Sequence, residues 1–361
     1  MEGLEVILNF WKDKKVFLTG HTGFKGSWLS LWLQSLGAQV TGYALTPPTT
    51  PNLFTVAKVE SGMRSVMGDI RDLDYLKKIM KETNPDIVIH MAAQPLVRYS
   101  YANPVETYMT NVMGTVHVLE AARENKQIKA ILNVTSDKCY DNKEIDRGYK
   151  EDEAMGGFDP YSNSKGCAEL VTSAYRNSFF NIEKYFEHGV ALATARAGNV
   201  IGGGDWAEDR LIPDFMRAIV KKQKVSIRNP HAIRPWQHVL EPLKGYLMLT
   251  QKLYEEGSKF SESFNFGPHE NDARSVEWIA EHLVASWGEG AAFEIAENAS
   301  QLHEAHFLKL DCEKARTQLA WQPLWPIEEA LGRICAWHRA HLNGEDMRTF
   351  SLNDIKTHQL H

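Results

Sequence analysis

The chain has 361 residues, of which 43% are hydrophobic and 24% charged, and these values are typical of a globular protein with one large α/β domain or two joined ones. The formal net charge of -6 argues against a general nucleic-acid-binding protein, because neutralising phosphates requires a basic surface. No apolar run approaches the roughly 20 residues that span a bilayer, so we expect no membrane segment.

The N-terminal stretch MEGLEVILNFWKDKKVF has charges on both sides of a short apolar run. It lacks the basic leader and long apolar core of a secretory signal, so we expect a cytoplasmic protein. The cysteines are widely separated, without the paired spacing of zinc ligands or of a disulfide framework. We therefore expect reduced thiols and no metal site. These cysteines are Cys139, Cys167, Cys312 and Cys335.

Short β-rich runs alternate with longer helical patterns from residue 15 to about residue 200. The strand-like runs are KVFLTG (15–20), QVTGYAL (39–45), RSVMGD (64–69), DIVIHMAA (86–93), KAILNVTS (129–136) and GVALATARAGNV (189–200). The helical patterns between them cover residues 25–37, 73–82, 104–125 and 162–179. This alternation predicts an α/β protein with a Rossmann-type, doubly wound parallel sheet and helices on both faces.

The first strand leads directly into TGHTGFKGSWL (19–29), which has glycines at Gly20, Gly23 and Gly26. Glycine permits a tight turn and lets backbone N–H groups approach a pyrophosphate at the start of the following helix. Between a strand and a helix, this pattern predicts a dinucleotide site rather than a plain turn. Lys25 is placed to reach a phosphate, although a solvated surface lysine is an equally good interpretation.

The second strand ends in GYALTPPTTPNLF (42–54), which has no Asp, Glu, Lys or Arg. An acidic residue at this place binds the adenosine ribose of NAD in many dinucleotide-binding folds, and its absence leaves NAD and NADP undistinguished. Asp69, after the third strand, is a candidate for a hydrogen bond to the adenine amine. A helix N-cap is the alternative interpretation of this residue.

The fifth strand ends in VTSDKCYD (134–141), which places a hydroxyl, a carboxylate and an ammonium side by side at Ser136, Asp137 and Lys138. YSNSK (161–165) then places Tyr161 and Lys165 on one face of a helix. A nearby ammonium lowers the pKa of a phenol, so we expect Tyr161 to serve as a base near neutral pH. Ser136 is expected to bind the same substrate hydroxyl, and Lys165 to hold a nicotinamide ribose.

The character of the chain changes after residue 200. Turn-rich segments such as GGGDWAEDR (202–210) and RNPHAIRP (228–235) separate the helical patterns at 211–222 and 275–287. We expect residues 1–200 to form the nucleotide-binding domain and residues 201–361 a smaller α/β lobe. The helical pattern at 239–257 is expected to pack on the first domain, which would then include about 237–262.

In their order and spacing, these motifs resemble the extended, nucleotide-sugar-modifying branch of the short-chain dehydrogenase/reductase superfamily. The resemblance runs from about Lys15 to LAWQPLWPIEEAL (319–331), and it implies NAD as cofactor and a nucleotide sugar as substrate. The implied cofactor-binding residues are Gly20, Thr22, Gly23, Phe24, Lys25, Gly26, Asp69, Ile70, Ala92, Ala93, Gln94, Thr110, Tyr161 and Lys165. The implied substrate-binding residues are Ser136, Asn199, Arg210, Leu211, Arg234 and Asn265, and Asn111 supports the catalytic group.

The triplet 136–138 separates two activities within this branch. The 4,6-dehydratases commonly carry Thr-Asp-Glu there, whereas the epimerases carry small, non-ionising residues. Expelling a hydroxyl from C6 of the sugar requires an acid at the leaving oxygen and a base at C5. The resemblance implies that Asp137 is the acid and that Lys138, if neutral, is the base. In the alternative interpretation Lys138 is protonated and pairs with Asp137 or a phosphate, so the two roles depend on each other.

GHTGFKGSWL, TSDKCYDN and residues 195–218 are most similar to the dehydratases that act on CDP-glucose. This similarity implies a 4-keto-6-deoxy sugar nucleotide as product, on the way to 3,6-dideoxyhexoses of bacterial surface polysaccharide. The alternatives are a 4,6-dehydratase or 4-epimerase for another nucleotide hexose, and a non-catalytic NAD-binding regulatory protein. The helical patterns near 105–125 and 161–178 resemble those of a two-fold interface in this superfamily, so we expect a homodimer.

Overall fold

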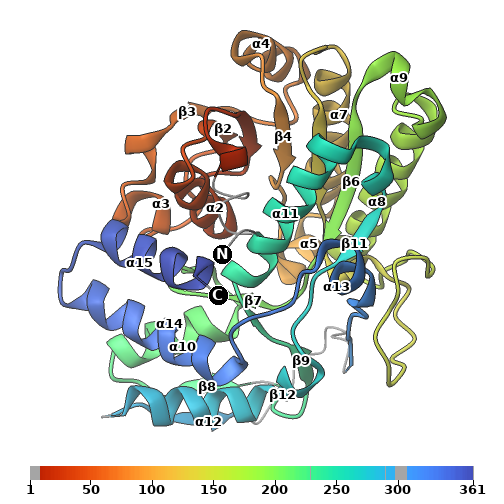
Figure 1. Ribbon diagram of the computed structural model, residues 1–361. Coiled ribbons are helices and arrows are strands. Elements are labelled where there is room, and N and C mark those ends of the chain that lie inside the picture. The colour runs from red at the N-terminus through yellow and green to blue at the C-terminus, as the bar shows by residue number, and fades with distance from the viewer. Residues whose placement is uncertain (1–8, 228, 289, 297–306, 361) are drawn as a thin grey trace.

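The computed structural model describes residues 9–227, 229–288, 290–296 and 307–360. Its centre is a seven-stranded sheet in the order β11-β6-β5-β4-β1-β2-β3, in which every neighbouring pair is parallel (Figure 1). The predicted α/β fold class is therefore confirmed. The strands are β1 (Lys15–Thr19), β2 (Gln39–Ala44), β3 (Arg64–Met67), β4 (Ile87–His90), β5 (Ala130–Val134), β6 (Ala191–Arg196) and β11 (Ser263–Asn265).

Helices cover both faces of this sheet, and alternate strand residues point to opposite faces. On β1, Val16 and Leu18 belong to one core cluster and Phe17 to another. The first cluster includes residues of α2 (Phe24–Ser35) and α11 (Leu240–Glu256). The second includes residues of α4 (Leu73–Thr83), α7 (Gly114–Arg123) and α8 (Pro160–Ser178), although its α8 members are only half-buried. Burial on both faces explains why the central strands read as continuous apolar runs.

The chain returns to this sheet after leaving it. Helix α11 packs on β5 and β6, and β11 then adds the outermost strand, with Ser263 opposite Thr194 and Asn265 opposite Arg196. A strand of three residues carries too little periodicity to be recognised, and the sequence had not predicted β11.

A second group of elements lies at the bottom of Figure 1 and has a core of its own. Its helices are α10 (Leu211–Val220), α12 (Val276–Trp287) and α14 (Ile327–Leu342). Its short strands form two-stranded pairs: β8 (Val225–Ile227) with β13 (Phe293–Ile295), and β9 (Ile233–Pro235) with β12 (Ala273–Ser275). The third pair is β7 (Val200–Ile201) with β10 (Gln237–His238). In the chain, β7 follows β6 of the sheet domain, and β10 precedes α11, which packs on that sheet.

The predicted helix 104–125 is divided. It consists of α6 (Pro104–Tyr108), a π-helical turn η2 (Met109–Met113) and α7. The remaining helices are α3 (Leu53–Val56), η1 (Val59–Gly62), α5 (Val97–Ala102), η3 (Asp137–Cys139), η4 (Ile182–Lys184), α9 (Tyr185–His188), η5 (Gly257–Phe260), η6 (Glu270–Asp272), α13 (Glu313–Leu319) and α15 (Met347–Gln359). Among the described residues, no helix is long and apolar enough to cross a membrane.

Candidate active site

The glycine turn after β1 lies so close to neighbouring backbone atoms that it has no room for side chains. Gly20 has φ +79°, and a Cβ atom there would lie 2.8 Å from the backbone nitrogen of Ala92. A Cβ atom on Gly26 would lie 2.0 Å from the carbonyl oxygen of Gly20. The turn therefore packs against the end of β4 and brings backbone N–H groups to the start of α2, which is the arrangement that holds a pyrophosphate.

A cavity of about 1020 Å³ extends from this turn along the ends of β2, β3 and β4. All the residues predicted to bind the cofactor line it: Gly20, Thr22, Gly23, Phe24, Lys25, Gly26, Asp69, Ile70, Ala92, Ala93, Gln94, Thr110, Tyr161 and Lys165. A turn that excludes side chains, next to a cavity at the carboxyl ends of parallel strands, fits a dinucleotide. The end of β2 contributes Leu45 and Thr46 to this lining, without an acid.

Asp69 is held by its neighbour Arg71. The guanidinium donates hydrogen bonds from Nε and Nη2 to both carboxylate oxygens. Burial acts to raise the pKa of Asp69, but the hydrogen bonds from Arg71 outweigh it and leave the pKa below its usual value. The N-cap of α4 is Asp72, which accepts a hydrogen bond from Tyr75, so the N-cap interpretation of Asp69 was wrong.

Asn111 supports the cofactor cavity from the π-helical turn η2 without lining it. Its Oδ1 accepts a hydrogen bond of 2.8 Å from the Gln94 backbone, and its Nδ2 donates to the Gln94 carbonyl and to Ser164 Oγ. The extra residue of a π turn points the amide inward at this position, and such turns often occur at functional sites. Asn111 thereby joins the loop after β4 to helix α8.

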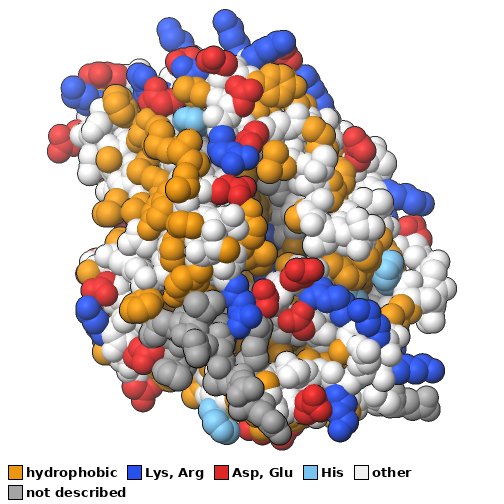
Figure 2. All heavy atoms as spheres, turned by 180° about the vertical axis from the view of Figure 1, so that it is seen from behind, with side chains coloured by type: hydrophobic (Ala, Val, Ile, Leu, Met, Phe, Trp, Pro, Cys, Tyr) orange, Lys and Arg blue, Asp and Glu red, His pale blue; other side chains and the backbone are white. Residues whose placement is uncertain are grey.

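A second cavity of about 1010 Å³ lies between the sheet domain and the smaller lobe and shares Tyr161 and Lys25 with the first. Figure 2, which shows the molecule from behind, has a hollow at its middle with charged side chains at the rim. Ser136, Asp137 and Lys138 line this second cavity. The predicted triplet therefore meets the predicted phenol where the two cavities join.

Hydrogen bonds order the groups at this junction. Ser136 Oγ donates to Asp137 Oδ1 at 2.9 Å, and the same hydroxyl is hydrogen-bonded to the phenol of Tyr161. Asp137 is 1% exposed, whereas Lys138 is half-buried at the cavity wall. A Cβ atom on Gly198 would lie 1.7 Å from Asp137 Oδ2, so only glycine leaves room for this carboxylate. Ser136 and Asp137 are thus buried side by side at the wall of the second cavity, with Lys138 half-buried next to them.

The burial of Tyr161, not a neighbouring ammonium, has the largest effect on the pKa of its phenol. It raises the pKa of the phenol to about 12, while the hydrogen bond with Ser136 acts in the opposite direction. The expectation that Lys165 brings this phenol near neutrality was therefore wrong for the protein alone. Burial lowers the pKa of Lys165 itself to about 8, against the raising effect of Glu169.

The predicted substrate residues divide into two groups. Asn199, Arg210, Leu211 and Arg234 line the second cavity. Asn265 does not, because it is fully buried and its amide is used within the protein. Its Oδ1 accepts from Tyr140 at 2.7 Å, and its Nδ2 donates to the carbonyls of Tyr149 and Asp311.

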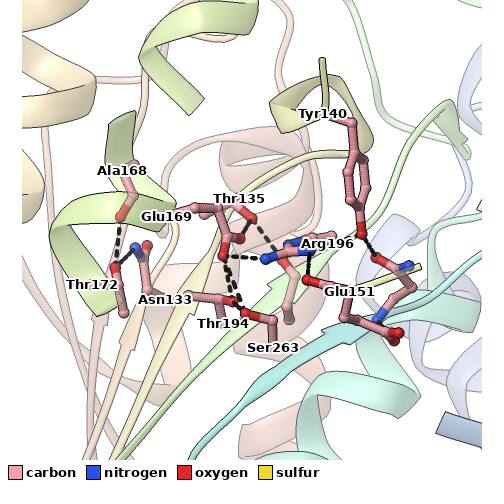
Figure 3. Close-up of polar contacts among 12 residues, drawn as sticks. Asn133, Thr135, Tyr140, Glu151, Ala168, Glu169, Thr172, Thr194, Arg196 and Ser263 are labelled. Atoms are coloured by element: carbon pink, nitrogen blue, oxygen red, sulfur yellow. Dashed lines mark hydrogen bonds and ion pairs between the residues drawn. The ribbon is translucent and has the colours of Figure 1, made fainter. Parts of the chain in front are cut away.

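A buried polar network supports the site from below (Figure 3). Arg196 on β6 donates a 2.8 Å hydrogen bond to Glu169 on α8, and Glu169 also accepts from Thr135, which precedes the triplet 136–138. Arg196 further donates to the hydroxyl of Tyr140, which follows the triplet. This network was not predicted from the sequence. The sequence feature that could have indicated the network is Glu169, a carboxylate four residues after Lys165 on the same predicted helix.

Comparisons with known proteins agree with this geometry. The family model described as GDP-mannose 4,6 dehydratase matches residues 17–334. The chain belongs to this dehydratase family. A CDP-glucose 4,6-dehydratase of Salmonella typhimurium is 60% identical to this family member over 347 residues, covering 96% of each chain.

Solved structures support the fold. A UDP-glucose 4-epimerase of Thermotoga maritima with UDP-glucose matches with a TM-score of 0.77 and 20% identity, covering 91% of this chain and 99% of the other. A dTDP-glucose 4,6-dehydratase of Bacillus anthracis in complex with NAD matches with a TM-score of 0.73 at 20% identity, covering 92% and 98%. Within the described ranges, no cluster of side chains is suited to hold a metal ion.

Proposed function

We propose that the protein is an NAD-dependent hydro-lyase that converts CDP-D-glucose to CDP-4-keto-6-deoxy-D-glucose and water. The observation that carries the proposal is the contact of Ser136 with both Asp137 and the Tyr161 phenol at the junction of the two cavities. Oxidation or epimerisation at C4 needs the phenol alone. An elimination across C5 and C6 also requires an acid and a base, and the carboxyl of Asp137, when protonated, and the amine of Lys138, when neutral, are adjacent groups that can supply them.

The first part of the reaction concerns C4 of the sugar. Tyr161, with Ser136 beside it, takes the proton of the 4-hydroxyl. The glycine turn and Lys165, which line the first cavity, would hold NAD there, and the cofactor would supply reversible hydride transfer with the sugar. Because burial holds the phenol protonated in the protein alone, we infer that the positive charge of the oxidised cofactor helps Tyr161 to ionise.

The second part is the loss of water. The ketone at C4 makes the C5 proton more acidic. Lys138, which lies at the cavity wall, removes this proton. Asp137 protonates the 6-oxygen, the C6–O bond breaks and water leaves. Lys138 then restores the proton at C5. Asp137 is buried, whereas Lys138 is half-buried where it faces the cavity.

The nucleotide assignment rests on the relative that is 60% identical and on the lining of the second cavity. Arg210 and Arg234 supply positive charge for a diphosphate, and Asn199 adds an amide with a left-handed backbone (φ +47°) at the cavity wall. Arg210 is itself held by Asp205 at 2.9 Å, which fixes its position.

Incubation with a panel of nucleoside-diphosphate glucoses and NAD tests the proposal. Mass spectrometry should show a product lighter than CDP-glucose by one water. An isobaric product would indicate a 4-epimerase, and a preference for another nucleotide would correct the substrate. Tight binding without turnover would indicate a regulatory NAD-binding protein instead.

We infer a homodimer, a cytoplasmic location and a role in making 3,6-dideoxyhexoses for bacterial surface polysaccharide. The dimer is supported by Val105, Met109 and Met113, which are exposed and spaced four apart on one face of the α6–η2 segment. Leu170 on the neighbouring helix α8 is 59% exposed. Figure 2 shows hydrophobic side chains gathered over the upper part of the molecule on the side of α8. Light scattering tests the dimer.

A further inference from the structure

The end of helix α14 forms one wall of the cofactor cavity, where His338 and His341 line it. Just beyond them, Arg348 of α15 donates hydrogen bonds to the Lys58 carbonyl at 3.0 Å and to Gln34 Oε1 at 2.8 Å. Lys58 lies between β2 and β3, and α15 packs on α2, so the end of α14 lies beside the chain that follows β2 (Figure 1). In dinucleotide-binding folds, the adenosine ribose lies at the end of β2.

A second set of contacts places His341 at the same end of the cavity. A Cβ atom on Gly204 would lie 2.8 Å from Leu53 Cδ1, so the chain at Gly204 touches the start of α3, shortly after β2. Two residues further on, the Trp206 ring contacts the His341 ring edge to face, with 5.3 Å between the ring centres. His341 also stacks on Trp337, with ring centres 5.6 Å apart. Two aromatic rings thus hold the imidazole in position at the cavity wall.

The loop that follows β2 does not supply the usual ribose ligand. It has no acid at the end of the strand. Two of its polar side chains form hydrogen bonds within the loop instead. Thr49 Oγ1 donates to the Pro51 carbonyl at 2.8 Å. Asn52 Nδ2 donates to the Thr49 carbonyl, and its Oδ1 accepts from the Thr55 backbone.

His341 has ring nitrogens available for a ligand. In the part of the chain that the structure describes, its ring contacts Trp206 and Trp337, but its nitrogens make no hydrogen bond. Burial lowers the pKa of this imidazole below its ordinary value of 6.5, so the ring is neutral near pH 7. A neutral imidazole carries one donor and one acceptor, and the two adjacent hydroxyls of a ribose can satisfy both.

We propose that His341 binds the hydroxyls of the adenosine ribose of the cofactor, in place of an acid at the end of β2. The inference rests on NAD as the cofactor and goes beyond the proposed function, because it does not depend on which sugar nucleotide is converted. The family model matches residues 17–334, so His341 lies outside the matched region. The smaller lobe thereby completes a cofactor site that the sheet domain leaves without its usual ribose ligand.

Calorimetric titration of the full chain with NAD tests the inference. His341→Phe keeps an aromatic ring against Trp206 and Trp337 but removes both ring nitrogens. NAD affinity should therefore fall roughly 5- to 10-fold, as expected for the loss of one net hydrogen bond. His269→Phe, at an exposed histidine outside the cavity, is the control and should bind NAD as the parent protein does.

Two analogues of NAD separate a ribose contact from an indirect effect of the substitution. In one the adenosine ribose lacks its 2′-hydroxyl, and in the other it lacks its 3′-hydroxyl. The parent protein should bind at least one of them more weakly than NAD. His341→Phe should bind that analogue and NAD about equally, because the hydroxyl no longer has a partner in this variant.

Three results would contradict the inference. The first is unchanged NAD affinity in His341→Phe. The second is a variant that still distinguishes NAD from the analogues as the parent does, because the ribose contact would then come from another group. The third needs no variant: a parent protein that binds both analogues as tightly as NAD makes no such contact.

The proposed function is tested separately from this contact. NAD binding that depends on His341, without a 4-keto product from any nucleoside-diphosphate glucose, would contradict the function and leave the ribose contact in place.

Discussion

Arg196 Nη2 lies 2.8 Å from Glu169 Oε2, and the two side chains are only 3% and 4% exposed. The pair joins β6 to α8, and through Thr135 and Tyr140 it reaches both ends of the triplet (Figure 3). The position of Ser136 relative to Tyr161 therefore depends on an ion pair that touches neither cavity.

Glu169→Gln should be strongly destabilising, because it leaves the Arg196 charge buried without its partner. Breaking a buried pair from one side costs about 3–5 kcal/mol. Urea unfolding measures this loss. The double variant Glu169→Leu with Arg196→Met removes both charges and should recover most of it. A Gln variant as stable as the parent protein would show that the pair contributes little.

Tyr161→Phe should abolish C4 oxidation, because it removes the group that takes the 4-hydroxyl proton. Stopped-flow absorbance of the reduced nicotinamide measures this step. Tyr175→Phe is a matched control on the same helix, since the Tyr175 hydroxyl bonds Glu120 away from both cavities. A normal rise of absorbance in Tyr161→Phe would remove the tyrosine from the mechanism.

The sequence predicted the sheet and the cofactor cavity well because both depend on local patterns. Buried parallel strands read as apolar runs, and a glycine turn after the first of them is recognisable from spacing alone. Tertiary relationships were not predictable in this way. Arg196 and Glu169 are far apart in sequence, and neither residue type nor spacing shows that they meet.

Asn265 illustrates the same limit. Asn265 was predicted to bind the substrate, but its side-chain amide is hydrogen-bonded to Tyr140, Tyr149 and Asp311 inside the protein. Asn265→Ala should therefore lower stability, by roughly 1–3 kcal/mol for each buried group left unpaired. Nucleotide affinity of the folded variant, measured by calorimetry, should stay unchanged. A selective loss of affinity at full stability would return Asn265 to the substrate site.

Lys138→Ala should separate oxidation from elimination. With the C5 base removed, the sugar can still be oxidised at C4, but exchange of the C5 proton with deuterated solvent should stop. Nuclear magnetic resonance of the recovered sugar nucleotide measures the exchange. Lys150→Ala, an exposed lysine of the same loop, provides the comparison. Undiminished exchange in Lys138→Ala would transfer the base role to another group.

Several buried histidines make stability depend on pH. Burial lowers the pKa of His21 to about 4 and the pKa values of His90 and His338 to about 3, from 6.5 in the unfolded chain. The unfolded chain therefore binds more protons below pH 6.5, and stability falls as the pH drops through this window. At a pH well above 6.5 these groups are neutral in both states and have no effect.

Unfolding free energy should accordingly be lower at pH 5.5 than at pH 7, by about 1.4 kcal/mol for each of the three histidines. Asp354 opposes this trend, because burial raises its pKa to about 6. Urea unfolding at the two pH values measures the difference. His338→Gln should reduce the pH dependence by about 1.4 kcal/mol, the contribution of one such group, and the exposed His269→Gln should leave it unchanged. Equal stability at both pH values would mean that these histidines accept protons inside the fold.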